Sequence, residues 1–250
     1  MSSNREMASM HTDRALDRAR SFIRERGDDP AIRDTFCYFT SHPLARLNRR
    51  RLIALVQRTL EETRRLGRPP RVLDLACGGG LIAETIATTG ATTLGLDLNA
   101  HEIELASAFA SAATFETADL IEDSAWERRV EVVLGGPPDI VVLAYALHHL
   151  PRVEGFVARL GTWLPAGALV LVNEENPRSP LFRAKHLFRT WVKRNTETEW
   201  HRTYGGWARL LSEARFEVEA PAGYDPIRVL GTLAPQRCWS LVFGARRRAN

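Results

Sequence analysis

Apolar residues in the first 70 positions recur at the spacing of amphipathic helices. One stripe runs over residues 13–26 and ends at Gly27, which is followed by turn residues at 28–30. A second stripe runs over residues 44–60, and its helix is expected to stop at Gly67. The chain is therefore predicted to begin with two helices that precede the main sheet.

From residue 71 the pattern changes to short apolar runs that alternate with helical segments. This alternation is typical of a parallel α/β sheet. The predicted strands cover residues 71–76, 92–97, 114–118, 139–144, 168–173, 216–220 and 238–245. The predicted helices cover residues 80–89, 99–112, 124–134, 152–164, 179–194 and 204–214. The three arginines at 246–248 are expected to form a solvated end of the chain.

Acidic residues stand at the ends of three successive predicted strands. The run VLDLACGGG (72–80) ends its strand at Asp74 and continues through glycines, which let a backbone approach a ligand, into a helix. Asp97 follows 23 residues later, the spacing of a carboxylate that binds ribose hydroxyls, and Asp119 follows the next strand. Open α/β sheets bind ligands at the carboxyl ends of their strands. A single Asp would be read as a helix cap, but the three together predict a nucleoside site.

The runs VLDLACGGG, GLDLN, TADL, DIVVLAYALHHL and LPAGALVLV, in this order and spacing, resemble the motifs of class I S-adenosylmethionine-dependent methyltransferases over residues 65–245. The resemblance implies an α/β fold with a Rossmann-like, seven-stranded, mostly parallel sheet, helices on both faces and an antiparallel last strand. It also implies S-adenosyl-L-methionine as cofactor and S-adenosyl-L-homocysteine as product. We expect a helical lid segment at 1–66 and a methyltransferase domain at 67–250, with a lid insert at 174–203.

The same resemblance implies cofactor roles position by position. Asp74 and the glycine loop, with Ala76, Cys77, Gly78 and Gly80, would hold the methionine end. Asp97 would bind the ribose hydroxyls, and Leu98 would pack on the adenine. Asp119 and Leu120 would contact the adenine edge, and Ala144 and Tyr145 would contact the methionine portion. Ala76 departs from the family pattern, which has glycine there. Cys77 could be a nucleophile, but we favour a small packed residue.

Candidates for catalysis and acceptor binding follow the fourth and fifth strands and lie in the expected lid. The candidate general bases are His148, His149 and His201, with His148 preferred, and each could instead pack or cap a helix. The candidate substrate-binding residues are Tyr38, His42, Glu174, His201 and Tyr204. Glu174 could instead be an ordinary solvated acid, and Tyr38 and His42 could instead be core or capping residues.

The charge distribution disfavours a nucleic-acid partner. Basic residues exceed acidic ones by 34 to 30, but the 15 arginines against 9 acidic residues in positions 1–70 account for the excess.

The cysteine content and the lack of long apolar runs bear on location and thiol state. Three cysteines without CxxC spacing predict reduced thiols, and no apolar run is long enough for a membrane span. We expect a cytoplasmic monomer or homodimer. Catechol-type relatives place a metal-binding carboxylate where this chain has Ala144 and Tyr145, so we expect no metal.

The sequence favours methyl transfer to oxygen or nitrogen of a small metabolite, in a specialised pathway suggested by the Arg- and Ala-rich composition. The loop AYALHH lacks the [DNS]PP[YF] pattern of nucleic-acid amino methyltransferases. The alternatives are an RNA methyltransferase that uses the basic N-terminal helices and a protein that binds the cofactor without catalysis. An NAD-dependent oxidoreductase would need a GxGxxG spacing that CGGGLIAE lacks.

Overall fold

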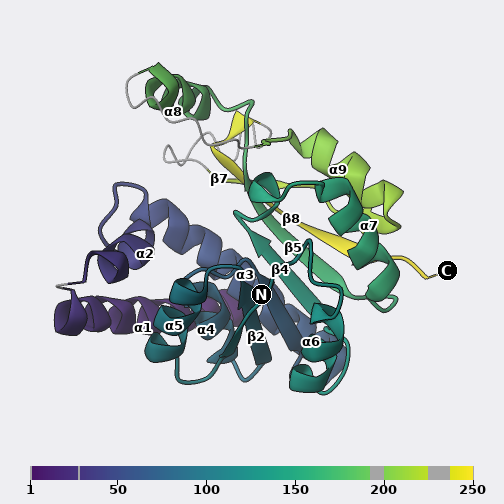
Figure 1. The fold of residues 1–250 in the computed structure, drawn as a ribbon, viewed down its shortest axis with the longest axis horizontal. Coiled ribbons are helices and arrows are strands. Elements are labelled where there is room, and N and C mark those ends of the chain that lie inside the picture. Colours follow the sequence, from purple (N-terminus) through teal and green to yellow (C-terminus); the bar gives the residue numbers. More distant parts are fainter. Residues whose placement is uncertain (1, 28, 192–199, 225–236, 250) are drawn as a thin grey trace. The chain divides into compact units, whose positions relative to one another are not determined.

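The computed structural model describes residues 2–27, 29–191, 200–224 and 237–249 (Figure 1). The chain divides into two compact units, Met1–Val142 and Leu143–Asn250, and each is described by itself. No helix among the described residues is long and apolar enough to cross a membrane.

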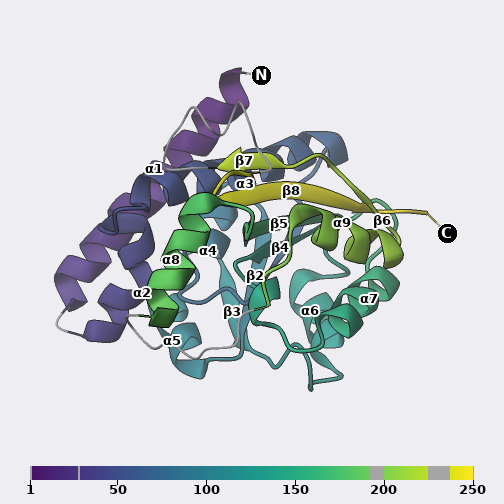
Figure 2. The same cartoon turned by 90° about the horizontal axis from the view of Figure 1, so that it is seen from above.

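Unit 1 begins with three helices, α1 (Ser2–Arg26), α2 (Pro30–Thr40) and α3 (Ala45–Leu66). Helix α1 packs against both α2 and α3 (Figure 2). The sequence predicted only a turn where α2 begins, and this was wrong. The Asp29 side chain accepts a hydrogen bond of 2.9 Å from Ala31 N, and Pro30 occupies the first turn, so the two residues start a helix.

The rest of unit 1 is a parallel sheet with its crossover helices. Strands β1 (Arg71–Leu75), β2 (Thr92–Asp97), β3 (Thr114–Thr117) and β4 (Ile140–Ala144) lie in the order β3-β2-β1-β4. All the printed pairings among them are parallel. Helices α4 (Leu81–Ala87), α5 (Ala100–Phe109) and α6 (Trp126–Leu134) connect them. The carboxyl ends of the strands therefore share one edge, as predicted.

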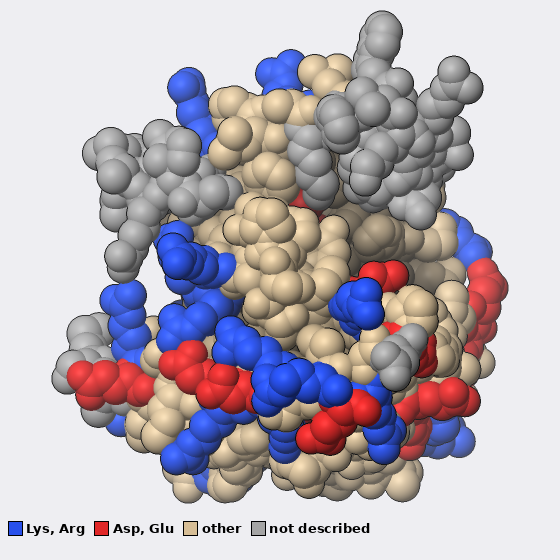
Figure 3. All heavy atoms as spheres, turned by 90° about the vertical axis from the view of Figure 1, so that its left-hand side faces the viewer, with Lys and Arg blue, Asp and Glu red and all other residues tan. Residues whose placement is uncertain are grey.

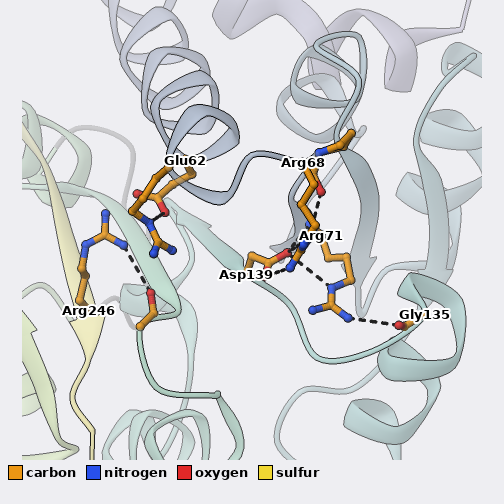
Figure 4. A network of polar contacts seen from close by, with 9 residues as sticks. Glu62, Arg68, Arg71, Gly135, Asp139 and Arg246 are labelled. Carbon is orange, nitrogen blue, oxygen red and sulfur yellow. Dashed lines mark hydrogen bonds and ion pairs between the residues drawn. The ribbon is translucent and has the colours of Figure 1, made fainter.

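An ion-pair network fixes the opposite, amino-terminal edge of this sheet (Figure 4). The carboxylate of Asp139, just before β4, accepts hydrogen bonds of 2.8 and 2.9 Å from the Arg68 guanidinium and of 2.8 Å from the Arg71 backbone N–H. The Arg71 guanidinium also donates to the Gly135 carbonyl at 3.1 Å. These contacts hold the starts of β1 and β4 in register.

A buried carboxylate ties α1 to the sheet layer. Glu84 of α4 is fully buried and accepts hydrogen bonds from the Ser111 hydroxyl (3.0 Å) and from backbone N–H groups of residues 111–113 (2.9–3.1 Å). Arg18 of α1 completes this shell with an ion pair to Glu84 and also lies over the Phe109 ring. The N-terminal helix is thus attached to the core of unit 1 by a satisfied buried charge.

Unit 2 pairs its strands antiparallel. Strand β8 (Ser240–Arg247) lies against β5 (Leu169–Glu175), β6 (Phe216–Val218) and β7 (Ala222–Tyr224). The other elements are a 3₁₀ turn (Leu147–His149), α7 (Val153–Trp163), α8 (Pro180–Trp191) and α9 (Tyr204–Glu213). The described part of the chain has eight strands rather than seven because β7 joins the sheet, and the last strand is antiparallel as predicted. The Rossmann-like α/β fold is confirmed.

The prediction of a solvated end at 246–248 was wrong for its first two arginines, which belong to β8. Arg247 is buried, and its Nε donates to the Gly161 carbonyl at 2.5 Å. The aliphatic stem packs inward while the guanidinium finds backbone acceptors, so a charged residue completes the strand.

Candidate functional site

The glycine loop after β1 is held in a conformation suited to close approach by a ligand. Ala76, Gly78 and Gly80 all have left-handed backbones, with φ of 56°, 50° and 75°. Gly80 has a second reason to lack a side chain, because a Cβ there would lie 2.6 Å from the Phe115 ring. Ala76 accepts the left-handed conformation that glycine would adopt more easily, so the departure from the family pattern is accommodated.

Asp97 closes the loop onto the end of β2. One carboxylate oxygen accepts from Gly78 N at 2.8 Å and the other from Asn99 N at 2.9 Å. Each oxygen of a carboxylate can accept more than one hydrogen bond, so Asp97 can hold the loop and still accept from ribose hydroxyls. Leu98 beside it is 66% exposed, a side chain available to an apolar ligand face.

Asp74 is the most perturbed acid at this edge. It is 1% exposed, and its Oδ2 has no hydrogen-bond partner among the described residues. Burial raises its pKa to about 8; the Ala83 backbone opposes this, and the negative charge of Asp97 adds to it. A buried carboxyl oxygen without a protein partner fits a ligand that supplies a positive charge or a donor, such as an ammonium group.

The remaining unit 1 candidates have mainly local contacts. Asp119 Oδ1 accepts from backbone N–H groups of residues 121 and 122 at 2.8 and 3.0 Å, and Leu120 is buried. Burial raises the pKa of the Cys77 thiol well above its ordinary value, which favours the packed residue over the nucleophile. Tyr38 stacks on His42, whose Nδ1 accepts from Leu44 N at 3.1 Å.

In unit 2 the structure brings four of the predicted residues together. Nδ1 of His148 lies 2.5 Å from Glu174 Oε2, and both side chains are buried, at 4% and 1% exposure. The other Glu174 oxygen accepts from Leu147 N at 2.7 Å. The His148 ring stacks on His201 at a centroid distance of 4.5 Å and tilts against His149 at 4.0 Å.

The other candidates in unit 2, Tyr145 and Tyr204, donate hydrogen bonds to backbone carbonyls. Tyr145 follows the buried Ala144 with a left-handed φ of 60°, uncommon for a bulky residue, and its N–H donates to Asn173 O at 2.8 Å. Tyr204 donates its hydroxyl to the Glu219 carbonyl at 2.8 Å and packs on Phe243. The roles of all these residues toward a ligand stay predictions.

A family described as a methyltransferase domain matches residues 44–221, well over half of the chain. The chain belongs to this methyltransferase family. The resemblance predicted from the strand-end motifs is thereby confirmed.

Curated relatives in this family are similar over part of their length. The chain is 31% identical over 137 residues to a ubiquinone biosynthesis O-methyltransferase of Rhizobium leguminosarum bv. trifolii, which covers 50% of each chain. It is 28% identical over 142 residues to the protein of the same name from Brucella ovis. The chain thus spans about half the length of the curated relatives that it matches.

Solved structures share the fold at lower identity. An S-adenosylmethionine-dependent methyltransferase from Mesorhizobium loti is 22% identical with a TM-score of 0.56, covering 72% of this chain and 91% of that one. A magnesium protoporphyrin IX methyltransferase from Synechocystis PCC 6803, crystallised with bound S-adenosylmethionine, is 15% identical with a TM-score of 0.54 and covers 82% of each chain. At such identities the likeness concerns the fold alone.

Sequence reasoning missed two polar residues of unit 1 that lie against the glycine loop. Thr35 of α2 donates to Glu102 of α5 at 3.0 Å. Glu102 stands five positions after Asp97, in the first turn of the following helix, and this placement was the available signal. Thr35 carried no signal because α2 was not predicted.

Proposed function

We propose that this chain is an S-adenosylmethionine-dependent methyltransferase that methylates oxygen or nitrogen of a small-molecule acceptor, with oxygen favoured. The family membership supports the reaction, and the relatives named O-methyltransferases support oxygen. The observation that carries the cofactor assignment is Asp74, whose buried Oδ2 has no partner in the described part of the chain and suits an ammonium group beside a glycine loop.

The residues present fit the cofactor in unit 1. Asp74 would accept from its amino group, Asp97 from its ribose hydroxyls, and Leu98 would cover an apolar face of the base. When bound, S-adenosylmethionine supplies a methyl group made electrophilic by the sulfonium, whose sulfur keeps the electron pair of the broken C–S bond. The protein has then to orient the acceptor in line and exclude water.

The pair His148–Glu174 supplies a way to remove the acceptor proton. With Nδ1 toward the Glu174 carboxylate, the imidazole would accept the hydroxyl proton at Nε2 as the new O–C bond forms. The adjacent carboxylate would stabilise the imidazolium and fix the ring orientation. His201, stacked on the same ring, is the alternative base. Tyr38, His42 and Tyr204 remain proposed acceptor contacts.

A small acceptor is favoured over RNA by the arrangement of charge. Across the lower part of the face in Figure 3, basic and acidic side chains are interleaved. Arginines of α1 and α3 pair with nearby acids, as in Arg20–Asp17, Arg49–Asp13 and Arg65–Glu62. A phosphate backbone binds best to unpaired basic groups of one sign. The cytoplasmic location, the oligomeric state and the specialised pathway stay proposals.

Titration calorimetry with S-adenosylhomocysteine, with NAD as the control ligand, tests the cofactor. Binding of the sulfur nucleoside alone is expected, and binding of NAD alone would overturn the proposal. Turnover on a panel of small phenols, amines and unmodified RNA then tests the acceptor. Methylation of RNA, or binding without turnover on any acceptor, would favour one of the two alternatives.

A further inference from the structure

A hydrogen bond between two remote helices sits at the glycine loop. The hydroxyl of Thr35, in α2, lies 3.0 and 3.1 Å from the two carboxylate oxygens of Glu102, in α5. Both residues are partly buried. Neither residue is among those to which the family motifs give a cofactor role.

The pair lies beside the loop backbone and fills the space that side chains on the loop glycines would need. A Cβ added to Gly79 would overlap the Thr35 methyl group and lie 3.4 Å from Glu102 Oε2. A Cβ on Gly78 would lie 4.0 Å from the same oxygen. The Glu102 carboxylate therefore lies beside the same loop whose Gly78 N–H group donates to Asp97.

Three carboxyl groups gather around this loop. Asp74, Asp97 and Glu102 each raise the pKa of the Cys77 thiol, after burial, which is the largest cause. Burial raises the pKa of Glu102 as well; the Thr35 hydroxyl opposes this and the charge of Asp97 adds to it. One carboxyl oxygen of the group, Asp74 Oδ2, is buried without a partner among the described residues. Like charges held together in this way favour a cationic or multiply donating ligand.

We propose that Glu102 is an additional cofactor-binding residue, and that Thr35 is the positioning residue that holds its carboxylate against the glycine loop. The Glu102 oxygens would accept from the amino group or a ribose hydroxyl of S-adenosylmethionine. The helix α2 then contributes to cofactor affinity through one hydroxyl group. The inference rests on the proposed use of this cofactor.

Four variants of the full chain test it, three single changes and the double variant of Glu102→Gln with Thr35→Val. Glu102→Gln removes the charge at constant size, Thr35→Val removes the hydroxyl, and Glu104→Gln is the control. Glu104 lies on the same helix with a side chain 80% exposed, so the same change there should leave binding unaltered. The dissociation constants of S-adenosylhomocysteine and of 5′-methylthioadenosine, which lacks the amino-acid part, are measured by calorimetry after far-UV spectra confirm folding.

We expect Glu102→Gln to weaken S-adenosylhomocysteine about 10- to 100-fold, as for a lost hydrogen bond to a charged group. Thr35→Val should weaken it less, and the double variant should bind no more weakly than Glu102→Gln alone, because Thr35 acts through Glu102. A loss confined to S-adenosylhomocysteine identifies the amino group as the donor, and an equal loss for both ligands identifies the ribose.

Unchanged or tighter binding by folded Glu102→Gln overturns the inference, as does additivity of the two changes. Either result leaves the cofactor assignment intact provided that the parent protein binds S-adenosylhomocysteine. If the parent fails to bind it, the proposed function itself is wrong. The two failures are therefore distinguishable in one set of titrations.

Discussion

The single residue Asp74 links the stability of unit 1 to its proposed ligand. Burial, the largest cause, raises its pKa to about 8, whereas the pKa of an aspartate in the unfolded chain is about 3.9. Between these values the folded protein binds the additional proton. The contribution of protonated Asp74 to the free energy of unfolding is therefore fully present below about pH 4 and is lost as the pH rises towards 8.

Because a pKa difference of one corresponds to about 1.4 kcal/mol, Asp74→Asn should stabilise the ligand-free protein by several kcal/mol at pH 8 and change it little at pH 4. The same variant should bind S-adenosylhomocysteine more weakly. Thermal unfolding at the two pH values, with exposed Glu104→Gln as control, checks the first expectation, and calorimetry checks the second. An equal melting shift at both pH values would show that Asp74 is not the titrating group.

The pair His148–Glu174 is predicted to accept the proton that the methyl acceptor loses. If His148 accepts the acceptor proton, His148→Asn should lower kcat about 10²- to 10⁴-fold, and Glu174→Gln should lower it by less. Binding of S-adenosylhomocysteine should be kept in both variants. His149→Asn, which alters the second candidate base beside His148, should lower kcat less than His148→Asn does. If kcat and its pH profile stay within a few-fold of the parent, orientation alone accounts for catalysis.

At the scale of elements, Asp139 joins the amino ends of β1 and β4. Burial raises the pKa of Asp139, but hydrogen bonds from Arg68 and Arg71 outweigh it, so the net pKa is lowered. A lowered pKa contributes stability above the pKa of the unfolded chain, about 3.9, and this stability is lost as the pH falls through the folded value.

Asp139→Asn should accordingly lower the free energy of unfolding by about 1–2 kcal/mol at pH 7, since the Arg68 side chain is 46% exposed and partly screened. The difference from the parent should shrink below about pH 4. Urea unfolding at both pH values measures it. Asp17→Asn is the control, because its carboxylate is 74% exposed and pairs only at the surface. A difference independent of pH would exclude the charge as the cause.

Strands β1, β2 and β4 were predicted within one residue because parallel strands buried on both faces are short continuous apolar runs bounded by turns. The start of α2 was not, because Asp followed by Pro is a sign of turns and of helix starts alike. Strand β7 was missed because its three residues, AGY, show no alternation. Local sequence thus decides the elements where only one local structure fits.

The site divides in the same way. The strand-end acids follow from topology, since parallel strands deliver their carboxyl ends to one edge. The partners of side chains do not follow, because His148 and Glu174 are 26 positions apart and Thr35 and Glu102 are 67 apart. Such contacts depend on how elements that are far apart in the chain pack together, which no local pattern specifies.

At the scale of the whole chain, the question is whether the N-terminal helices fold with the sheet or as a separate lid. Residues 1–66 were expected to form a lid, and that role toward the acceptor is still a prediction. Within unit 1, however, α1 packs on α4 as well as on α2 and α3, and Phe22 of α1 contacts the Phe36 and Phe109 rings. Removing residues 1–30, as a test of the lid, would expose the core of unit 1.

Arg18→Met in the full chain tests this integration more sharply than a truncation. The change keeps the aliphatic stem but leaves the fully buried Glu84 carboxylate without its cationic partner. The four remaining hydrogen bonds to Glu84 limit the cost, so we expect about 1–3 kcal/mol of lost stability.

Arg20→Met is the matched control on the same helix, because the Arg20–Asp17 pair is exposed and should contribute little. If α1 folds with the sheet, Arg18→Met should lower the protection of the β1 and β2 amides in native-state hydrogen exchange by the same free energy as that of the α1 amides. A loss of protection confined to α1, with the β1 and β2 amides unchanged, would show that the N-terminal helix unfolds independently of the sheet.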